Sequence, residues 1–186
     1  CLIVGAGGLG CPVGLYTSAA GFGYIEIWDE DTIEITNLNR QIAHKTNKIG
    51  YNKAENLAKE CLKINPNITV RFQSSNFDIS KDINIFDIIF DCSDNQETKY
   101  ALNYLSHKHK KILISGSAVQ MEGQLSVLKS GLNNTLPCYE CIFPKTSEKA
   151  PITNCREAGI IGSITAFIAS MQVSEAIKEI ALLNYP

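Results

Sequence analysis

The hexapeptide Gly5–Gly10, GAGGLG, constrains the fold of this chain more than any other segment. It follows a short apolar stretch, Leu2–Val4, and leads into a stretch rich in small residues, Leu9–Ala20, that is expected to be helical. Tyr24–Trp28 then has the composition of a second strand. This order predicts a β-α-β unit in which backbone amides and a helix N-terminus can bind phosphate. The motif fits nicotinamide, flavin and adenylate sites alike, so the nucleotide stays open at this point.

Strand and helix signals continue to alternate along the chain. Further strands are expected at 68–72, 86–90 and 111–115, and further helices at 50–64, from about 95 to 109, and at 162–183. Phe86–Phe90 is continuously apolar, as strands buried in parallel sheets are, whereas Gly123–Lys129 alternates like a half-exposed or antiparallel strand. We therefore predict one α/β domain over 1–186, with a Rossmann-like, doubly wound mixed sheet and an antiparallel extension.

Composition narrows the class of protein. The 186 residues are 45% hydrophobic with a formal net charge of -2, which gives no electrostatic support for binding nucleic acid. The longest weakly polar stretch, Gly159–Met171, is shorter than the ~20 apolar residues of a membrane span, so no membrane segment is expected. Residue 1 already falls in the first strand, so we expect no signal peptide and a fragment truncated at both ends. Seven cysteines, an odd number, fit reduced thiols and a cytoplasmic setting.

The segment Trp28–Gln41, WDEDTIEITNLNRQ, adds polar groups downstream of the glycine loop. Asp29 ends the second expected strand, where a carboxylate can accept hydrogen bonds from both ribose hydroxyls. Arg40 is one of only three arginines in the chain, and its guanidinium has the fork of donors that suits phosphate oxygens. A solvated loop arginine is the open alternative. Asp31 is expected to shape the turn.

Two more charged residues are candidates for a nucleotide site. Lys53 stands in the first turn of an expected helix, where its ammonium could reach a triphosphate, although exposed helix lysines are common. Asp94 follows an apolar strand at the edge where open α/β sheets bind ligands, and a carboxylate there suits Mg²⁺. The nearby Asp91 is expected to close the strand and orient the loop.

The cysteines divide into two groups. Cys138 and Cys141 have the C-x-x-C spacing that lets two thiolates occupy adjacent corners of a tetrahedral zinc site, and they fall in a Pro-flanked loop rather than at a helix start typical of a redox pair. Cys155 lies beside Arg156, and a neighbouring positive charge favours the thiolate form of a cysteine. A loop cysteine without a chemical role is an equal alternative. The remaining cysteines are expected to be small core residues, and His44, His107 and His109 show no metal-like grouping, so no role is assigned to them.

The motifs taken together carry a family resemblance over nearly the whole chain. They are GAGGLG at 5–10, WDEDTIEITNLNRQ at 28–41, GYNK at 50–53, DCSDN at 91–95, EGQ at 122–124, CYECIFP at 138–144 and TNC at 153–155. This set resembles the adenylation domain of ubiquitin-like-protein activating enzymes. Within that superfamily it is most similar to the molybdopterin-synthase adenylyltransferase and sulfurtransferase branch, which also serves a sulfur carrier used in tRNA thiolation.

The resemblance implies ATP-dependent adenylylation of the C-terminal glycine of a ubiquitin-like or sulfur-carrier protein ending in Gly-Gly, by a homodimeric enzyme. The nucleotide-binding positions that it implies are Gly5, Gly7, Gly8, Gly10, Asp29, Asn37, Arg40, Gln41, Lys53 and Asp94. Arg40, Lys53 and Asp94, the last with Mg²⁺, would act in catalysis, and Cys155 matches the cysteine of a later thioester or persulfide step. Cys138 and Cys141 would hold half of a structural Zn²⁺ site.

Some features of that family fall outside residues 1–186. These are an arginine upstream of the glycine loop, a second C-x-x-C pair and, in some relatives, a rhodanese domain. Two alternatives stay open. One is a non-catalytic partner subunit of a heterodimeric activating enzyme, which predicts the loss of nucleotide-binding residues. The other is an NAD-dependent dehydrogenase, which needs a substrate domain and gives no reason for Arg40, Lys53 and Asp94 together.

Overall fold

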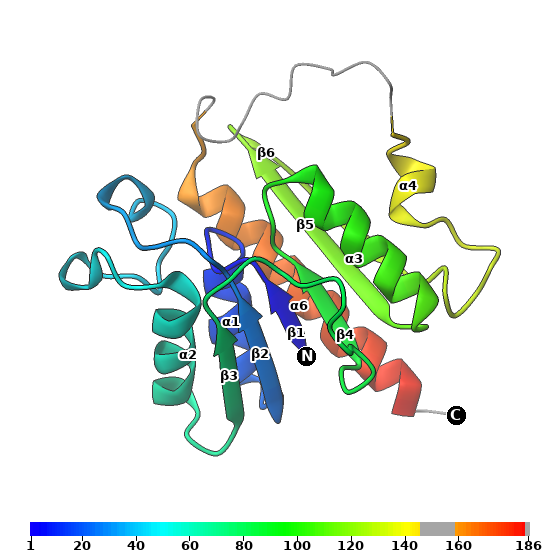
Figure 1. The fold of residues 1–186 in the computed structure, drawn as a ribbon, viewed down its shortest axis with the longest axis horizontal. Helices are drawn as coiled ribbons and strands as arrows, with labels where there is room; N and C mark the ends of the chain where they lie inside the picture. The colour runs from blue at the N-terminus through cyan, green and yellow to red at the C-terminus, as the bar shows by residue number, and fades with distance from the viewer. Residues whose placement is uncertain (146–158, 185–186) are drawn as a thin grey trace.

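The computed structural model describes residues 1–145 and 159–184 and has a six-stranded sheet at its centre (Figure 1). The strand order is β3-β2-β1-β4-β5-β6. The strands are β1 (Leu2–Val4), β2 (Tyr24–Trp28), β3 (Thr69–Gln73), β4 (Ile88–Asp91), β5 (Ile112–Val119) and β6 (Glu122–Leu128). Strands β1 to β5 are parallel, and β6 is antiparallel to β5. The predicted α/β fold, a mixed sheet with an antiparallel extension, is confirmed.

Helices cover both faces of the sheet. On one face α1 (Gly10–Ala19) packs against α2 (Lys53–Ile64) and α6 (Gly162–Asn184), and α6 also crosses β5 and β6. On the other face α3 (Gln96–Lys108) packs against β4, β5 and the short α4 (Tyr139–Ile142), as Figure 1 shows. No helix in the described part of the chain is long and apolar enough to cross a membrane.

The apolar strands supply a core on each side of the sheet. Because successive side chains of a strand point to opposite faces, Ile3 packs into the core under α1, α2 and α6, whereas Leu2 and Val4 pack into the core under α3. All three are nearly inaccessible to solvent. Burial on both faces explains why β1 and β4 are continuously apolar in sequence.

The order of the strands defines where a ligand can enter. After β1 the chain builds β2 and β3 on one side, and it then returns to place β4 and β5 on the other. Val4 lies in register with Trp28 on β2 and with Asp91 on β4, so the carboxyl ends of three neighbouring strands meet at one edge. Open α/β sheets bind ligands at this switch point, outside the carboxyl ends of the strands.

Most element boundaries lie within two residues of the predictions, as where β4 begins at Ile88 rather than Phe86, and three differences are larger. Helix α2 begins at Lys53 rather than Gly50, because Gly50 has a φ of 87° and the side chain of Asn52 caps the helix by accepting the N–H of Glu55 at 3.0 Å. Strand β5 extends to Val119 because its antiparallel pairing with β6 continues that far. The short helix α4 lies within the segment predicted as loop.

Candidate functional site

A cleft of about 300 Å³ lies at the carboxyl ends of β1, β2 and β4. Its walls come from the glycine loop, the end of β2, residues 37–41, the start of α2 and the loops after β3 and β4. The predicted nucleotide residues that line it are Gly5, Gly7, Gly8, Asp29, Asn37, Arg40, Gln41, Lys53 and Asp94. Gly10, the first residue of α1, lies behind the lining. The fold therefore gathers at one cleft residues that are up to ninety positions apart in sequence.

The glycine loop fits closely between β1 and β4. Gly5 has a φ of 99°, and a Cβ there would lie 2.5 Å from the carbonyl oxygen of Cys92. A Cβ on Gly10 would lie 1.9 Å from the carbonyl oxygen of Gly5. Both contacts are shorter than real Cβ atoms allow, so only glycine permits this turn and the approach of α1 to it.

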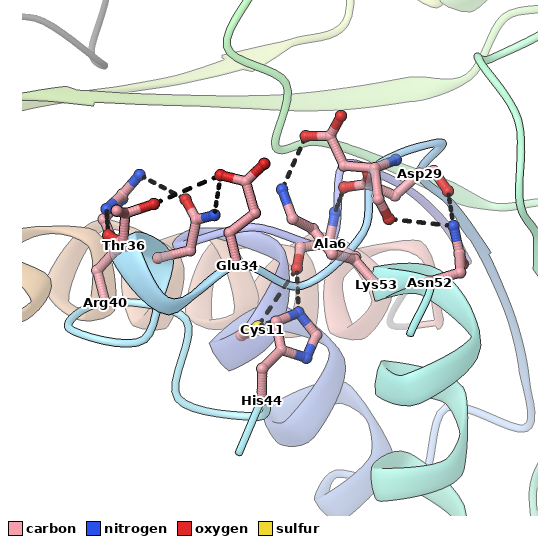
Figure 2. Close-up of polar contacts among 11 residues, drawn as sticks. Ala6, Cys11, Asp29, Glu34, Thr36, Arg40, His44, Asn52 and Lys53 are labelled. Atoms are coloured by element: carbon pink, nitrogen blue, oxygen red, sulfur yellow. Dashed lines mark hydrogen bonds and ion pairs between the residues drawn. The ribbon is translucent and has the colours of Figure 1, made fainter. Parts of the chain in front are cut away.

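Asp29 ties the end of β2 to the glycine loop. Its Oδ2 accepts the N–H of Ala6 at 2.7 Å and its Oδ1 accepts the N–H of Asp31 at 2.9 Å (Figure 2). Burial raises the pKa of Asp29, and these two hydrogen bonds oppose that rise. Each carboxylate oxygen has a second lone pair, so Asp29 can still accept a hydroxyl group of a ligand in the cleft.

Lys53 is held at the cleft by Asp31. The Lys53 ammonium lies 2.7 Å from Oδ2 of Asp31, and only 7% of its side chain is exposed. Asn52 donates its side-chain amide to the backbone oxygens of Asp29 and Asp31 at 2.9 and 3.2 Å, which fixes the start of α2 against the end of β2 (Figure 2). Lys53 therefore presents a nearly buried positive charge at the wall of the cleft.

Arg40 belongs to a loop that is bonded within itself. Its Nη1 donates to the backbone oxygen of Thr36 at 3.2 Å and to Oδ1 of Asn39 at 3.0 Å, and its Nη2 donates to Oδ1 of Asn37 at 3.1 Å. These bonds hold the guanidinium against a short 3₁₀ turn, η1 (Ile35–Asn37). A guanidinium has five N–H donors, so donors remain for an anion.

Gln41 carries an unsatisfied buried oxygen. The residue is 3% exposed and lines the cleft, and its Oε1 has no hydrogen-bond partner among the described residues. The side-chain nitrogen lies 3.5 Å from where a Cβ on Gly7 would stand, so the amide abuts the glycine loop. A buried acceptor without a donor costs roughly 1–3 kcal/mol, and a ligand that brings an N–H or O–H group to this corner would remove that cost.

The loop after β4 contains one exposed and one buried carboxylate. Asp94 is exposed and lines the cleft. Asp91, the last residue of β4, is fully buried, and its Oδ1 accepts both the N–H and the hydroxyl of Ser93. Its Oδ2 accepts the hydroxyl of Ser115 at 2.6 Å and the ammonium of Lys99 at 2.9 Å. Asp91 thus closes the strand and orients the loop that carries Asp94.

Two residues of this neighbourhood were missed by sequence reasoning. Lys99 is buried on α3 and lines the cleft, and the available signal was its position on the same helical face as the buried Leu102, Asn103 and Ser106. His44 is also buried and contacts the glycine loop, with Nε2 3.0 Å from the carbonyl oxygen of Ala6. No feature of the sequence near His44 indicated this contact.

Cys138 and Cys141 lie together at the start of α4. Their sulfur atoms are 3.5 Å apart and partly exposed. Burial raises the pKa of Cys138, but hydrogen bonds from Asn103 and Cys141 outweigh it and the net shift is downward. Two thiolates on one tetrahedral zinc ion lie about 3.8 Å apart, so the pair fits two corners of such a site. Residues 1–145 and 159–184 contain no group of three metal ligands, and Cys155 lies outside the described residues.

Comparisons with known proteins agree with this geometry. The chain is 42% identical to the adenylyltransferase and sulfurtransferase MOCS3 of Caenorhabditis briggsae, over 98% of this chain and 46% of that protein. It is 42% identical to the adenylyltransferase and sulfurtransferase UBA4 of Scheffersomyces stipitis, over 95% of this chain and 40% of that protein. The chain thus spans less than half the length of these relatives.

Solved structures share the fold. Escherichia coli MccB superposes with a TM-score of 0.80 and 23% identity, over the whole of this chain and 56% of that one. A structure of MccB with ATP superposes with a TM-score of 0.74 and 25% identity, over 95% of this chain and 54% of that one. The sequence matches the ThiF family over residues 1–185. This chain belongs to the ThiF family.

Proposed function

We propose that the domain catalyses ATP-dependent adenylylation of the C-terminal glycine of a ubiquitin-like or sulfur-carrier protein. The observation that carries the proposal is the convergence of Arg40, Lys53 and Asp94 on one cleft beside a phosphate-type glycine loop. The names of the curated relatives, adenylyltransferase and sulfurtransferase, support the same reaction class.

ATP is the proposed nucleotide because the cleft supplies complementary groups for each of its parts. The glycine loop and the N-terminus of α1 face the phosphates, and Asp29 stands where ribose hydroxyls would donate. The unpaired Oε1 of Gln41 can only accept a hydrogen bond, and phosphate oxygens are acceptors too. We therefore propose that Oε1 binds a ribose hydroxyl or an N–H of the carrier tail. The solved complex of MccB with ATP supports this choice.

The chemistry proposed for the cleft requires charge stabilisation rather than a base. The carrier's terminal carboxylate attacks the α-phosphorus, an acyl–O–P bond forms, and the bond to the bridging oxygen breaks as pyrophosphate leaves with its electron pair. Negative charge therefore increases on the α-phosphate and on the leaving group. Arg40 and Lys53, already held at the cleft wall, stabilise that charge without reorganising.

Asp94 is the residue that would hold Mg²⁺. Its carboxylate is exposed into the cleft, and oxygen ligands are those that Mg²⁺ prefers. Held by Asp94, the ion would supply positive charge that offsets part of the negative charge of the phosphates. Asp91 does not fit this role, because Lys99, Ser93 and Ser115 already satisfy both of its oxygens.

A transfer step through Cys155 follows adenylylation in this proposal. Its thiolate would attack the carbonyl carbon of the acyl-adenylate, so that a thioester forms as the bond to phosphate breaks and AMP leaves. In the persulfide route, Cys155 would first receive an outer sulfur from a persulfide-bearing donor protein, and attack of that sulfur on the same carbon would give an acyl disulfide and AMP. Cys138 and Cys141 would supply half of a structural zinc site, and their spacing of 3.5 Å supports this. Molybdenum-cofactor biosynthesis and tRNA thiolation are the proposed settings, and the free thiols among the described residues support a cytoplasmic location.

A homodimer is the proposed assembly. Helix α6 carries exposed apolar side chains, with Phe167 62%, Ile177 46% and Leu182 67% exposed, and Tyr16 of α1, 53% exposed, lines a shallow hollow together with Ile177. Apolar surface of this kind is common where a subunit is covered by another. Sedimentation equilibrium of the purified protein tests the proposal.

Two alternatives make different predictions. A non-catalytic partner subunit would lack nucleotide-binding residues, yet the predicted ones line the cleft together. An NAD-dependent dehydrogenase would use the same glycine loop but gives no role to Arg40, Lys53 and Asp94 as a group. Mass spectrometry of a Gly-Gly carrier after incubation with ATP separates the proposed enzyme from both alternatives, because only the proposed enzyme forms a carrier acyl-adenylate.

A further inference from the structure

His44 contacts the rear of the glycine loop, on the side away from the cleft. It is 5% exposed, and Nε2 lies 3.0 Å from the carbonyl oxygen of Ala6 (Figure 2). Nδ1 lies 2.9 Å from the side-chain nitrogen of Asn56, on α2. The imidazole therefore connects helix α2 to the glycine loop through one ring.

The hydrogen bonds of Asn56 define which ring nitrogen of His44 is protonated. The side-chain nitrogen of Asn56 also donates to the backbone oxygen of Ala43 at 3.1 Å, which orients the amide with its NH₂ group toward Nδ1. Nδ1 is then the acceptor, so the single proton of the neutral ring is on Nε2 and is donated to Ala6. In this state every polar atom of the ring has a complementary partner.

The direction of the Ala6 carbonyl determines the direction of the next N–H. No peptide bond among the described residues is cis, and in a trans peptide the C=O of one residue and the N–H of the next point in opposite directions. Because the Ala6 carbonyl points at His44, the Gly7 N–H points the other way, and Gly7 lines the cleft. No acceptor among the described residues takes the Gly7 N–H.

The preceding peptide is held as well. The N–H of Ala6 donates to Asp29 at 2.7 Å, and the thiol of Cys11 makes a second contact, 3.4 Å, with the Ala6 carbonyl. Ala6 is thus fixed on both sides, by a carboxylate on its N–H and by His44 on its carbonyl. The Asp29 contact does not by itself orient the Ala6–Gly7 peptide, whose oxygen is held by His44 and by the longer contact of the Cys11 thiol.

We propose that His44 is a positioning residue for phosphate binding, which holds the Ala6–Gly7 peptide so that the Gly7 N–H faces a phosphate oxygen of the bound nucleotide. It touches no ligand and acts through the backbone. The proposal rests on the proposed function only in taking a nucleoside triphosphate as the ligand of the cleft.

Protonation of His44 would break this arrangement. A second ring proton, on Nδ1, would face the NH₂ group of Asn56, which is also a donor. Burial lowers the pKa of His44 below 6.5, the hydrogen bond to Ala6 raises it, the charge of Lys53 lowers it and that of Glu60 raises it. The other neighbour, the Cys11 thiol, stays neutral because burial raises its pKa to about 12. The ring is therefore fully partnered above pH 6.5, and as the pH falls through the lowered pKa it loses the Asn56 contact that orients it, while Nε2 keeps its proton.

The test compares ATP with adenosine, which has no phosphate, by calorimetry on the full-length protein without carrier. In His44→Phe the donor to Ala6 is lost, so ATP affinity should fall about tenfold or more, the effect of one lost hydrogen bond to a charged group. Adenosine affinity should stay within about twofold, because ribose and base contacts do not depend on the Gly7 N–H. In His44→Gln a side-chain amide can still reach Ala6, so most ATP affinity should return.

A pH series supplies the second readout. As the pH falls from about 7.5 through the lowered pKa of His44, wild-type ATP affinity should fall more steeply than that of His44→Gln, which has no ionisable ring. Parallel pH dependences would overturn the proposal, as would equal weakening of ATP and adenosine in His44→Phe. A His44-dependent ATP affinity without adenylylation of any carrier would retain this inference and reject the proposed function.

Discussion

The ammonium of Lys99 lies 2.9 Å from Oδ2 of Asp91, and the two side chains are 8% and 0% exposed. Lys99 also donates to the backbone oxygen of Gly116 at 3.0 Å, so one buried cation joins the end of β4 and the middle of β5 to helix α3. Asp91 is closed off from bulk water, and Lys99 is exposed only slightly, where it lines the cleft. Because Asp91 also accepts two hydrogen bonds from Ser93, the pair lies next to the loop that carries Asp94.

Lys99→Met should destabilise the fold strongly, because it leaves the Asp91 carboxylate buried without its cation. We expect the free energy of unfolding in urea to fall by about 3–5 kcal/mol. Lys59→Met is the matched control, since Lys59 forms an exposed pair with Glu55 at 2.7 Å and should cost no more than ~0.5 kcal/mol. Similar losses in the two variants would show that the Asp91 pair is no more important than a surface pair.

Gly10→Ala should disrupt the glycine loop, since its new Cβ would lie 1.9 Å from the backbone oxygen of Gly5. Relieving that overlap requires the loop or α1 to move, at a cost of roughly 1–3 kcal/mol in unfolding free energy, together with loss of ATP binding. Gly23→Ala is the control, because a Cβ at Gly23 meets nothing within 4 Å and its φ is not positive. ATP affinity that survives in Gly10→Ala would contradict the structure of this turn.

Asp94→Ala should remove activity without weakening the fold. Asp94 is exposed in the cleft, so the unfolding free energy should change by less than ~0.5 kcal/mol. Adenylate formation should fall about 100-fold or more, the order expected when a group that stabilises transition-state charge is removed. Glu97→Ala, an exposed carboxylate outside the cleft lining, serves as the control and should retain activity. Retained adenylylation in Asp94→Ala would exclude the proposed Mg²⁺ role.

Cys155→Ala should separate the two proposed steps. Adenylylation needs no thiol, so carrier adenylate should form at the wild-type rate, while transfer of the acyl group or sulfur should stop. Single-turnover assays of adenylate formation and of transfer, run on the same preparation, measure both. Loss of adenylylation equal to that in Asp94→Ala would contradict the separate role of Cys155.

The parts of the fold that sequence predicted correctly are those with strong local signals. GAGGLG between an apolar stretch and a helix is recognisable because its geometry admits only glycine at Gly5 and Gly10. Residues 116–119, GSAV, have no clear strand pattern of their own and are held by a tight hairpin in which Val119 pairs with Glu122, so the extension of β5 to Val119 was not predicted. Helix α4 was missed because four residues within a Pro-containing loop give too short a periodic pattern.

The site was partly predictable for a similar reason. Asp29, Arg40 and Asp94 follow strands or belong to a recognisable motif, so their approach to one cleft followed from the strand order. His44 was not predictable, because its partner Ala6 becomes a neighbour only after folding, and for Lys99 the only signal was its position on the buried face of α3, which does not reveal its partner Asp91. A lysine in a polar helix and a histidine in a polar loop are ordinary surface residues by sequence alone.

Carrier-dependent exchange of labelled pyrophosphate into ATP tests the central claim most directly. The full-length protein is incubated with ATP, Mg²⁺ and ubiquitin-fold carriers that end in Gly-Gly, each beside the same carrier without its terminal glycine. The account predicts exchange with at least one intact carrier, and none with its truncated form. ATP binding without exchange for any carrier would contradict it and favour a non-catalytic partner subunit.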